Sequence, residues 1–296
     1  MKTRVIAVVN QKGGVGKTTV CRTLGAMLRD NGYKVLLIDV DAQQTLSLTL
    51  GAVSKVFDES TPSMYHLLTG QIPVEDAILY GDNYDLIRSD YRLYGYTGAP
   101  LITIEKAAEL ESNPKRLYEH VIQNLKRQQN PETDERHNIR RILDGLVKSE
   151  AYDYIIFDTN PNLGILTSEC LLSNPIVNVL IPVFPEESSR QAVVALNDTI
   201  KTILNNDLSQ EIRIIGILVS KYENNKISKK YLHYFKKLAQ KMDTVLFHTL
   251  IPKSIIVSEA MALKQTVFDR RKKAHILDEY HAFYREFLER MKELDQ

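Results

Sequence analysis

The 296-residue sequence has no tryptophan and only two cysteines, Cys21 and Cys170. Cysteines this far apart lack the paired spacing of a cysteine-based metal site, and so few of them cannot form a disulfide framework. We therefore expect both cysteines to be small apolar residues of the interior. Their scarcity also favours a reducing compartment, and we expect the protein to be cytoplasmic.

The sequence also lacks a long apolar run and an excess of charge of either sign. No uninterrupted apolar stretch approaches the roughly 18 residues that a membrane-spanning helix needs, and the segment MKTRVIAVVN at the start does not resemble a signal peptide. The 38 Lys and Arg residues against 37 Asp and Glu give a net charge of +1. This balance excludes a globally basic nucleic-acid coat, although a basic patch on one face is still compatible with it.

Short apolar runs separated by helix-length segments recur along the chain. Uninterrupted β-branched and apolar runs are typical of strands that are buried on both faces. The predicted strands are Val5–Val9, Val35–Ile38, Tyr154–Phe157, Val177–Ile181, Ile214–Val219 and Val245–Ile251. This rhythm favours an α/β fold, with a mostly parallel, twisted sheet and helices on both faces.

Three further regions complete the predicted organisation. Residues 51–85 contain Pro62, Pro73, Gly70 and Gly81 and are expected to form short helices and turns. Residues 102–149 are polar, and we expect a helical elaboration there within a single domain that spans residues 1–296. Residues 274–294 have the pattern of an amphipathic helix, which we expect to pack on the body of the protein.

The most informative segment is K-G-G-V-G-K-T-T, Lys12 to Thr19, between the first predicted strand and the helix after it. Glycines allow successive backbone N–H groups to point at phosphate oxygens, and the start of a helix adds partial positive charge. Lys17 would reach the β- and γ-phosphates of a nucleotide, and the Thr18 hydroxyl would complete the Mg²⁺ coordination. The expected nucleotide contacts are Gly13, Gly14, Val15, Gly16, Lys17, Thr18 and Thr19.

Two predicted strands end in acidic residues. Asp39 and Asp41 follow the second strand, in the segment L-L-I-D-V-D-A-Q, and Asp158 follows the strand Tyr154–Phe157. In open α/β sheets, ligands bind at the carboxyl ends of the strands. We therefore expect these carboxylates to lie near the glycine-rich loop.

Together these segments resemble the ParA/MinD class of P-loop ATPases, whose deviant Walker A loop carries a second lysine, here Lys12. The resemblance implies ATP and Mg²⁺ as cofactors, and a homodimer formed on ATP binding in which Lys12 reaches the partner's nucleotide. It implies that Asp41 orients the attacking water, that Asp158 holds Mg²⁺ through water and that Asp39 supports the loop or the metal. It also implies a nucleotide-proximal loop at Pro252. The resemblance covers most of the chain except roughly residues 90–145.

The sequence departs from the class at two positions. Ala42 and Asn160 stand where the switch segments of this class usually have proline. A polar and less rigid residue at position 160 could alter the timing of hydrolysis. The glycine-rich loop begins at residue 12, so we expect no N-terminal helix-turn-helix domain in this chain.

Members of this class have different functions, and two features of the sequence exclude some of these functions. Cysteine-ligated iron–sulfur members are excluded by the cysteine count, and the acidic segment 286–295 is unlike a basic membrane-binding helix. We therefore expect no membrane partner. The prediction is a ParA-type DNA partition ATPase, whose ATP-bound dimer binds DNA without sequence preference on the nucleoid. A ParB-like centromere-binding protein would stimulate its slow hydrolysis.

Non-specific DNA binding requires a basic surface patch. The candidate residues form two clusters, which are Arg270, Arg271, Lys272 and Lys273, and Lys226, Lys229 and Lys230. The first is slightly favoured because four contiguous cations concentrate the potential. The alternative is a MinD-like or other protein-positioning or regulatory switch that does not bind DNA, with residues 102–149 as a docking surface.

Overall fold

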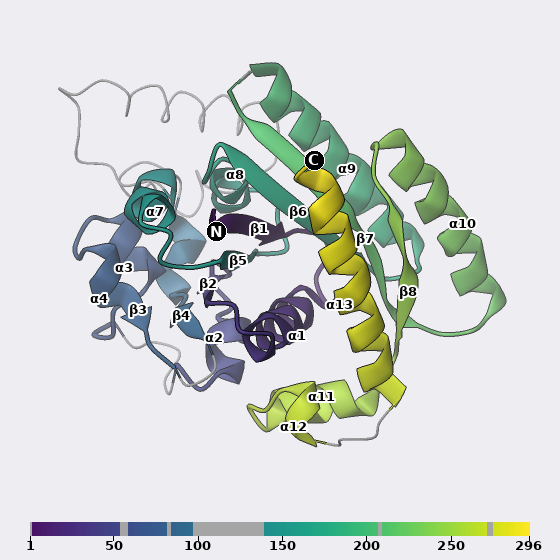
Figure 1. Ribbon diagram of the computed structural model, residues 1–296, viewed down its shortest axis with the longest axis horizontal. Coiled ribbons are helices and arrows are strands. Elements are labelled where there is room, and N and C mark those ends of the chain that lie inside the picture. The colour runs from purple at the N-terminus through teal and green to yellow at the C-terminus, as the bar shows by residue number, and fades with distance from the viewer. Residues whose placement is uncertain (1, 54–58, 82–83, 97–138, 207–208, 271–274) are drawn as a thin grey trace.

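An eight-stranded sheet runs through the computed structural model, in the order β3-β4-β2-β5-β1-β6-β7-β8 (Figure 1). The structure describes residues 2–53, 59–81, 84–96, 139–206, 209–270 and 275–296. The strands are β1 Arg4–Val8, β2 Val35–Asp39, β3 Ile78–Leu79, β4 Asp85–Ile87, β5 Tyr154–Asp158, β6 Ile176–Val183, β7 Glu211–Tyr222 and β8 Leu246–Pro252. All neighbouring strands are parallel except β3 and β4. The predicted fold class is confirmed.

Both faces of the sheet are covered, as uninterrupted apolar strands require. In β1, Val5 and Ala7 belong to one apolar core, whereas Ile6 and Val8 belong to the other. The first core includes residues of α3 Met64–Leu68, α4 Val74–Ala77, the 3-10 helix η1 Tyr91–Gly95, α7 Ile139–Lys148, α8 Ile165–Leu171, α9 Glu187–Asn206 and α10 Lys226–Lys241. The second includes residues of α1 Lys17–Asp30, α2 Thr45–Thr49, α11 Ile255–Ala262, α12 Val267–Arg270 and α13 His275–Leu294.

The C-terminal helix α13 packs on the body, as predicted from its amphipathic pattern. Its buried residues include Tyr280, Phe283 and Phe287, and the Phe283 ring lies edge-on to that of Phe247 on β8 at 5.2 Å. The apolar face of α13 is therefore occupied by the sheet. None of the helices in the described ranges is both long enough and apolar enough to cross a membrane.

The prediction for residues 51–85 was incomplete. The region contains α3 and α4, but it also contributes β3 and the first residue of β4 to one edge of the sheet. Strands of two and three residues are too short to produce a readable periodicity. Of the expected elaboration at 102–149, residues 102–138 lie outside the described residues. The rest contains α7, whose Ile139, Leu143 and Leu146 are buried.

Candidate functional site

The glycine-rich loop joins the carboxyl end of β1 to the start of α1. Gly13 to Gly16 form the turn, and Lys17, Thr18 and Thr19 begin the helix. Gly14 and Gly16 have φ angles of 76° and 95°, which favour glycine because it has no Cβ atom. A Cβ atom on Gly13 or Gly14 would meet no atom of the described residues within 4 Å. The loop therefore leaves room for a ligand beside its backbone.

Lys17 is held by the loop that precedes it. Its side chain is buried, and Nζ donates hydrogen bonds to the carbonyl oxygens of Asn10 at 3.1 Å and Lys12 at 3.2 Å. Burial lowers the pKa of Lys17, and the charges of Asp158 and Asp41 oppose this shift. Neutral carbonyl groups are weaker partners than an anion, so a phosphate group would bind this ammonium more strongly.

Two buried carboxylates lie on neighbouring strands beside the loop. Asp39 on β2 is in register with Asp158 on β5, and burial raises the pKa of both carboxyl groups. Asp39 Oδ2 accepts hydrogen bonds from Ser47 N at 2.8 Å and Ser47 Oγ at 2.7 Å, and Asp39 Oδ1 accepts one from Asp41 N at 3.1 Å. Both oxygens of Asp39 are therefore occupied within the protein.

Asp158 differs from Asp39 in its hydrogen bonding. It is only 1% exposed, yet among the described residues neither of its carboxylate oxygens accepts a hydrogen bond of good distance and angle. The neighbouring Thr18 hydroxyl and the Lys17 ammonium oppose the rise in its pKa. A buried polar group without a partner is rare. Asp158 therefore has the free acceptor capacity that a hydrated cation requires.

The donor set fits Mg²⁺. The described residues contain no cluster of three or more His, Cys, Asp and Glu residues that could hold a metal by themselves. Mg²⁺ usually keeps several waters and binds one or two carboxylates together with phosphate oxygens of a substrate. Thr18, Asp158 and a bound phosphate would supply such a set.

The segment after each acidic strand is also fixed. Asp41 Oδ1 accepts a hydrogen bond from Gln43 N at 3.0 Å, and burial raises the pKa of Asp41. Asn160 stands at the usual proline position, and its Oδ1 accepts a hydrogen bond from Thr167 Oγ1 of α8 at 2.7 Å. The polar residue at position 160 is therefore tied to the helix that follows it.

The second lysine of the loop, Lys12, lies at the rim of the site. Its side chain is 33% exposed and forms an ion pair with Glu186, while Nζ lies 2.6 Å from Ser188 Oγ. This contact lowers the pKa of Glu186. Within one chain, Lys12 is therefore held by the start of α9.

The far side of the loop is contacted by β7. Ser220 Oγ donates a hydrogen bond to Val15 O at 2.5 Å, and Lys221 Nζ donates one to Gly14 O at 2.7 Å. Pro252 ends β8 beside Tyr222. The glycine-rich loop and Pro252, which the sequence assigned to nucleotide binding, are thus both contacted by the carboxyl end of β7.

Of the two basic clusters, only one can be described. Lys226, Lys229 and Lys230 are exposed on the first turns of α10, and Lys230 Nζ lies 5.8 Å from the centre of the Tyr234 ring. Arg270 ends α12, but its side chain and residues 271–273 lie outside what the structure describes. The role of that cluster stays a prediction.

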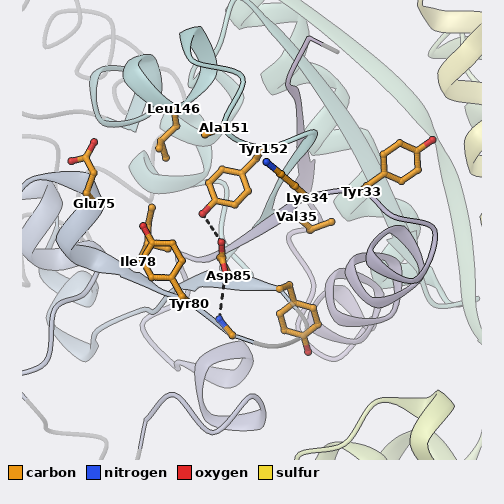
Figure 2. A pocket seen from close by; sticks show the side chains of 12 residues that line it. Tyr33, Lys34, Val35, Glu75, Ile78, Tyr80, Asp85, Leu146, Ala151 and Tyr152 are labelled. Carbon is orange, nitrogen blue, oxygen red and sulfur yellow. Dashed lines mark hydrogen bonds between the residues drawn. The ribbon is translucent and has the colours of Figure 1, made fainter.

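A cavity of about 560 Å³ lies at the opposite end of the strands (Figure 2). Its lining residues include Lys34 and Val35 at the start of β2, Asp85 at the start of β4, and Tyr152. Tyr152 donates a hydrogen bond to Asp85 Oδ2 at 2.7 Å. Since these are amino ends of parallel strands, the cavity is separate from the glycine-rich loop.

Ser47, the partner of Asp39, could not be recognised from the sequence. Ser47 lies in α2, eight positions after Asp39, and no local motif distinguishes it from the other serines. A serine shortly after an acidic strand end is a weak signal, because it reaches the aspartate only when the chain folds back, as it does here in the short helix α2.

Comparison with known proteins identifies the family of the chain. A family model described as an AAA domain, AAA_31, matches residues 3–214. The chain is 30% identical over 259 residues to the sporulation initiation inhibitor protein Soj of Bacillus subtilis, covering 87% of each chain. It is 28% identical over 266 residues to the chromosome-partitioning ATPase Soj of Thermus thermophilus, covering 90% of this chain and 88% of the relative.

Solved structures show the same fold. Apo McdA from Cyanothece aligns with a TM-score of 0.72 at 19% identity, covering 97% of this chain and 99% of the other. Cobyrinic acid a,c-diamide synthase from Mycobacterium smegmatis, solved with bound ADP and magnesium, aligns with a TM-score of 0.62 at 26% identity, covering 85% and 87%.

Proposed function

This chain belongs to the ParA/MinD family of P-loop ATPases, and we propose that it acts within this family as a DNA partition ATPase. The observation that carries the proposal is the contact between the glycine-rich loop and the segment leading into α10. Lys221 donates a hydrogen bond to Gly14 O, and the exposed lysines of α10 begin at Lys226. A nucleotide that reorganises the loop would therefore act directly on a basic surface.

The cofactors are ATP and Mg²⁺. Lys17 would hold the β- and γ-phosphates, the backbone N–H groups from Gly13 to Thr19 would bind phosphate oxygens, and Thr18 with Asp158 would hold the ion. Bound Mg²⁺ neutralises the phosphate charge. Pro252 lies at the same edge of the sheet and would contact the nucleotide.

Hydrolysis would depend on Asp41 and Lys12. The Asp41 carboxylate would accept a hydrogen bond from the attacking water and orient it. Lys12 would be supplied to the nucleotide of the second subunit, and to do so it must leave Glu186 and Ser188. Because this exchange accompanies dimerisation, we propose slow turnover and an ATP-bound homodimer.

The ATP-bound dimer would bind DNA through phosphate contacts and would associate with the nucleoid. Exposed lysines on α10 support this role because contacts to phosphate dominate sequence-independent binding. A ParB-like centromere-binding protein would stimulate hydrolysis and thereby release the dimer from DNA.

The test is a charge reversal on α10 with a matched control. The variant carries Lys226→Glu, Lys229→Glu and Lys230→Glu, and the control carries the same change at Lys34, Lys148 and Lys292, which are exposed elsewhere. DNA binding is measured by fluorescence anisotropy with a non-hydrolysable ATP analogue at several salt concentrations. We expect the α10 variant to lose at least about 10-fold in affinity, with a shallower salt dependence.

The outcomes distinguish the two candidate DNA-binding surfaces from the absence of DNA binding. Equal binding by the α10 variant and the wild type would dismiss α10 and direct attention to Arg270–Lys273. Hydrolysis of ATP without DNA binding in any nucleotide state would contradict the partition function. It would favour the alternative, a switch that acts on a protein partner.

A further inference from the structure

Two buried serines tie the Asp39–Asp41 segment to the neighbouring strand β4. Ser47 donates hydrogen bonds from both N and Oγ to Asp39 Oδ2. Ser89, two residues beyond the end of β4, donates from Oγ to the carbonyl oxygen of Asp41 at 2.6 Å. Ser89 N donates in turn to Ser47 Oγ at 2.9 Å.

These contacts close a ring of hydrogen bonds. Asp39 binds Ser47, Ser47 binds Ser89, Ser89 binds the Asp41 carbonyl, and the Asp41 N–H group returns to Asp39 Oδ1 at 3.1 Å. Ser47 and Ser89 are both 0% exposed, so solvent does not compete for their hydroxyl groups. The backbone of Asp41 is therefore held at both its N–H and its C=O group.

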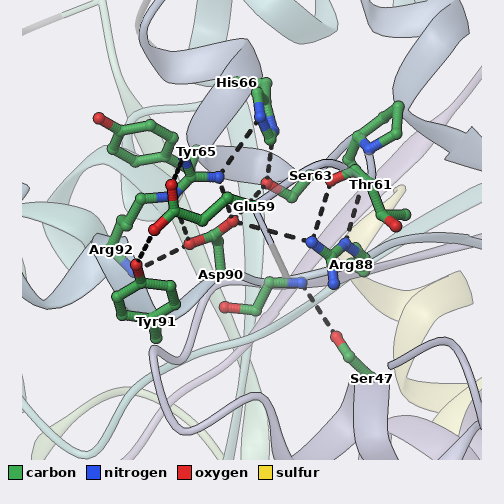
Figure 3. A network of polar contacts seen from close by, with 12 residues as sticks. Ser47, Glu59, Thr61, Ser63, Tyr65, His66, Arg88, Asp90, Tyr91 and Arg92 are labelled. Carbon is green, nitrogen blue, oxygen red and sulfur yellow. Dashed lines mark hydrogen bonds and ion pairs between the residues drawn. The ribbon is translucent and has the colours of Figure 1, made fainter. Parts of the chain in front are cut away.

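A polar network on the other side fixes Ser89 itself. Arg88 is 0% exposed and donates to the carbonyl oxygens of Pro62 at 3.1 Å and Thr61 at 2.9 Å. Asp90 accepts hydrogen bonds from Ser63 Oγ at 3.0 Å and Arg92 Nη2 at 2.7 Å. Figure 3 shows this network, with Ser47 reaching the backbone from the opposite side. Ser89 is thus anchored by both of its neighbours in sequence.

We propose that Ser89 is a positioning residue for ATP hydrolysis, acting through the carbonyl group of Asp41. The proposal rests on the proposed function, in which the Asp41 carboxylate orients the attacking water. Orientation of a reacting group is sensitive to displacements of about 1 Å, which can cost about 100-fold in rate. Nucleotide binding, by contrast, uses the loop Gly13–Thr19 and does not need Ser89.

The experiment separates ATP hydrolysis from nucleotide binding in the 296-residue chain. In Ser89→Ala the Asp41 carbonyl loses its side-chain donor and keeps only the backbone N–H of Gln44 at 2.7 Å. We expect the kcat of ATP hydrolysis to fall about 10- to 100-fold. The Kd for Mg-ADP should stay within about 2-fold of wild type, because the bonds of Lys17 are unchanged. A thiol is close to a hydroxyl in size but is a weaker donor, so Ser89→Cys should have an intermediate kcat.

The matched control is Ser63→Ala. Ser63 is also 0% exposed and belongs to the same network, but it donates to Asp90 rather than to the Asp39–Asp41 segment. We expect this variant to hydrolyse ATP at the wild-type rate, because Asp90 keeps its hydrogen bonds from Arg92 N, Nε and Nη2 and so still holds Ser89 in place. It therefore reports what the loss of a buried hydroxyl does without a change at Asp41.

Four results would overturn the inference. These are a wild-type kcat in Ser89→Ala, an equal loss of kcat in Ser63→Ala, a parallel loss of Mg-ADP affinity in Ser89→Ala, and a kcat of Ser89→Cys as low as that of Ser89→Ala. If Ser89→Ala does not fold, Ser89→Cys against Ser63→Ala provides the same comparison. Absence of hydrolysis by the wild type would instead contradict the proposed function.

Discussion

An aspartate at the carboxyl ends of the parallel strands and one at their amino ends differ in hydrogen bonding. At the carboxyl ends, Asp158 is 1% exposed and neither of its oxygens has a full hydrogen-bond partner among the described residues. At the amino ends, Asp85 accepts hydrogen bonds from Tyr152 at 2.7 Å and from Gly81 N at 3.3 Å. A buried charge without a partner costs stability. A bound ligand can offset this cost at Asp158, and we therefore propose that Asp158 belongs to the ligand site, whereas Asp85 has a structural role.

The largest effect should come from Lys17→Ala at the carboxyl end. This change removes the buried ammonium that would hold the β- and γ-phosphates, and we expect Mg-ADP binding to fall below detection by calorimetry. Lys34→Ala changes an exposed lysine at the amino-end cavity and serves as the control. Normal Mg-ADP binding by Lys17→Ala would remove the distinction between the two ends.

Asp158→Asn should stabilise the nucleotide-free protein but reduce the stabilisation that Mg-ADP provides. The neutral amide removes a buried charge whose desolvation outweighs the attraction of Lys17 and Thr18, so we expect the free energy of unfolding without nucleotide to rise by about 1–3 kcal/mol. The additional stability conferred by Mg-ADP should decrease, since the amide is a poorer partner for a hydrated cation. Urea denaturation with and without Mg-ADP measures both effects. A less stable nucleotide-free variant would show that Asp158 is satisfied within the protein.

Glu169 on α8 tests whether burial alone, away from both ends, makes a carboxylate costly. Its oxygens accept hydrogen bonds from Tyr96 Oη at 3.0 Å and Ile139 N at 3.3 Å, yet burial raises its pKa to about 7. Because the folded state holds the proton more tightly than the unfolded state, stability should fall as pH rises from about 4.5 to 7, by up to about 3 kcal/mol.

Glu169→Gln removes this titration and should flatten the dependence of unfolding free energy on pH in that range. Denaturation at pH 5 and pH 7 is sufficient to compare the two proteins. An equally steep dependence in the variant would assign the pH effect to other groups.

The smallest effect should come from Tyr152→Phe at the amino end. Asp85 is only half-buried, so water can replace the lost hydroxyl, and we expect a loss of about 0.5–1.5 kcal/mol in unfolding free energy. Mg-ADP affinity and ATP hydrolysis should not change. A change in either would connect the cavity of Figure 2 to the nucleotide site.

The sequence was sufficient to predict the parallel sheet and the position of the loop, because uninterrupted apolar strands and the segment from Lys12 to Thr19 are strong local signals. It was not sufficient for β3 and β4, which are too short to show a period. Nor did it indicate the contact between Ser47 and Ser89, which are 42 positions apart and meet only because β4 pairs with β2. Asp39 differs from Asp158 because it accepts hydrogen bonds from Ser47 and from the Asp41 N–H group, and the contact with Ser47 was equally beyond a local pattern.

The most direct test of the account is a titration of non-specific DNA with the wild-type protein in ADP, in ATP and in a non-hydrolysable ATP analogue, repeated at several salt concentrations. The account predicts binding only with the triphosphates, and a steep loss of affinity with salt whose slope reports the number of phosphate contacts. Binding that is equal in all three nucleotides, or absent in all three while the protein still hydrolyses ATP, would contradict it.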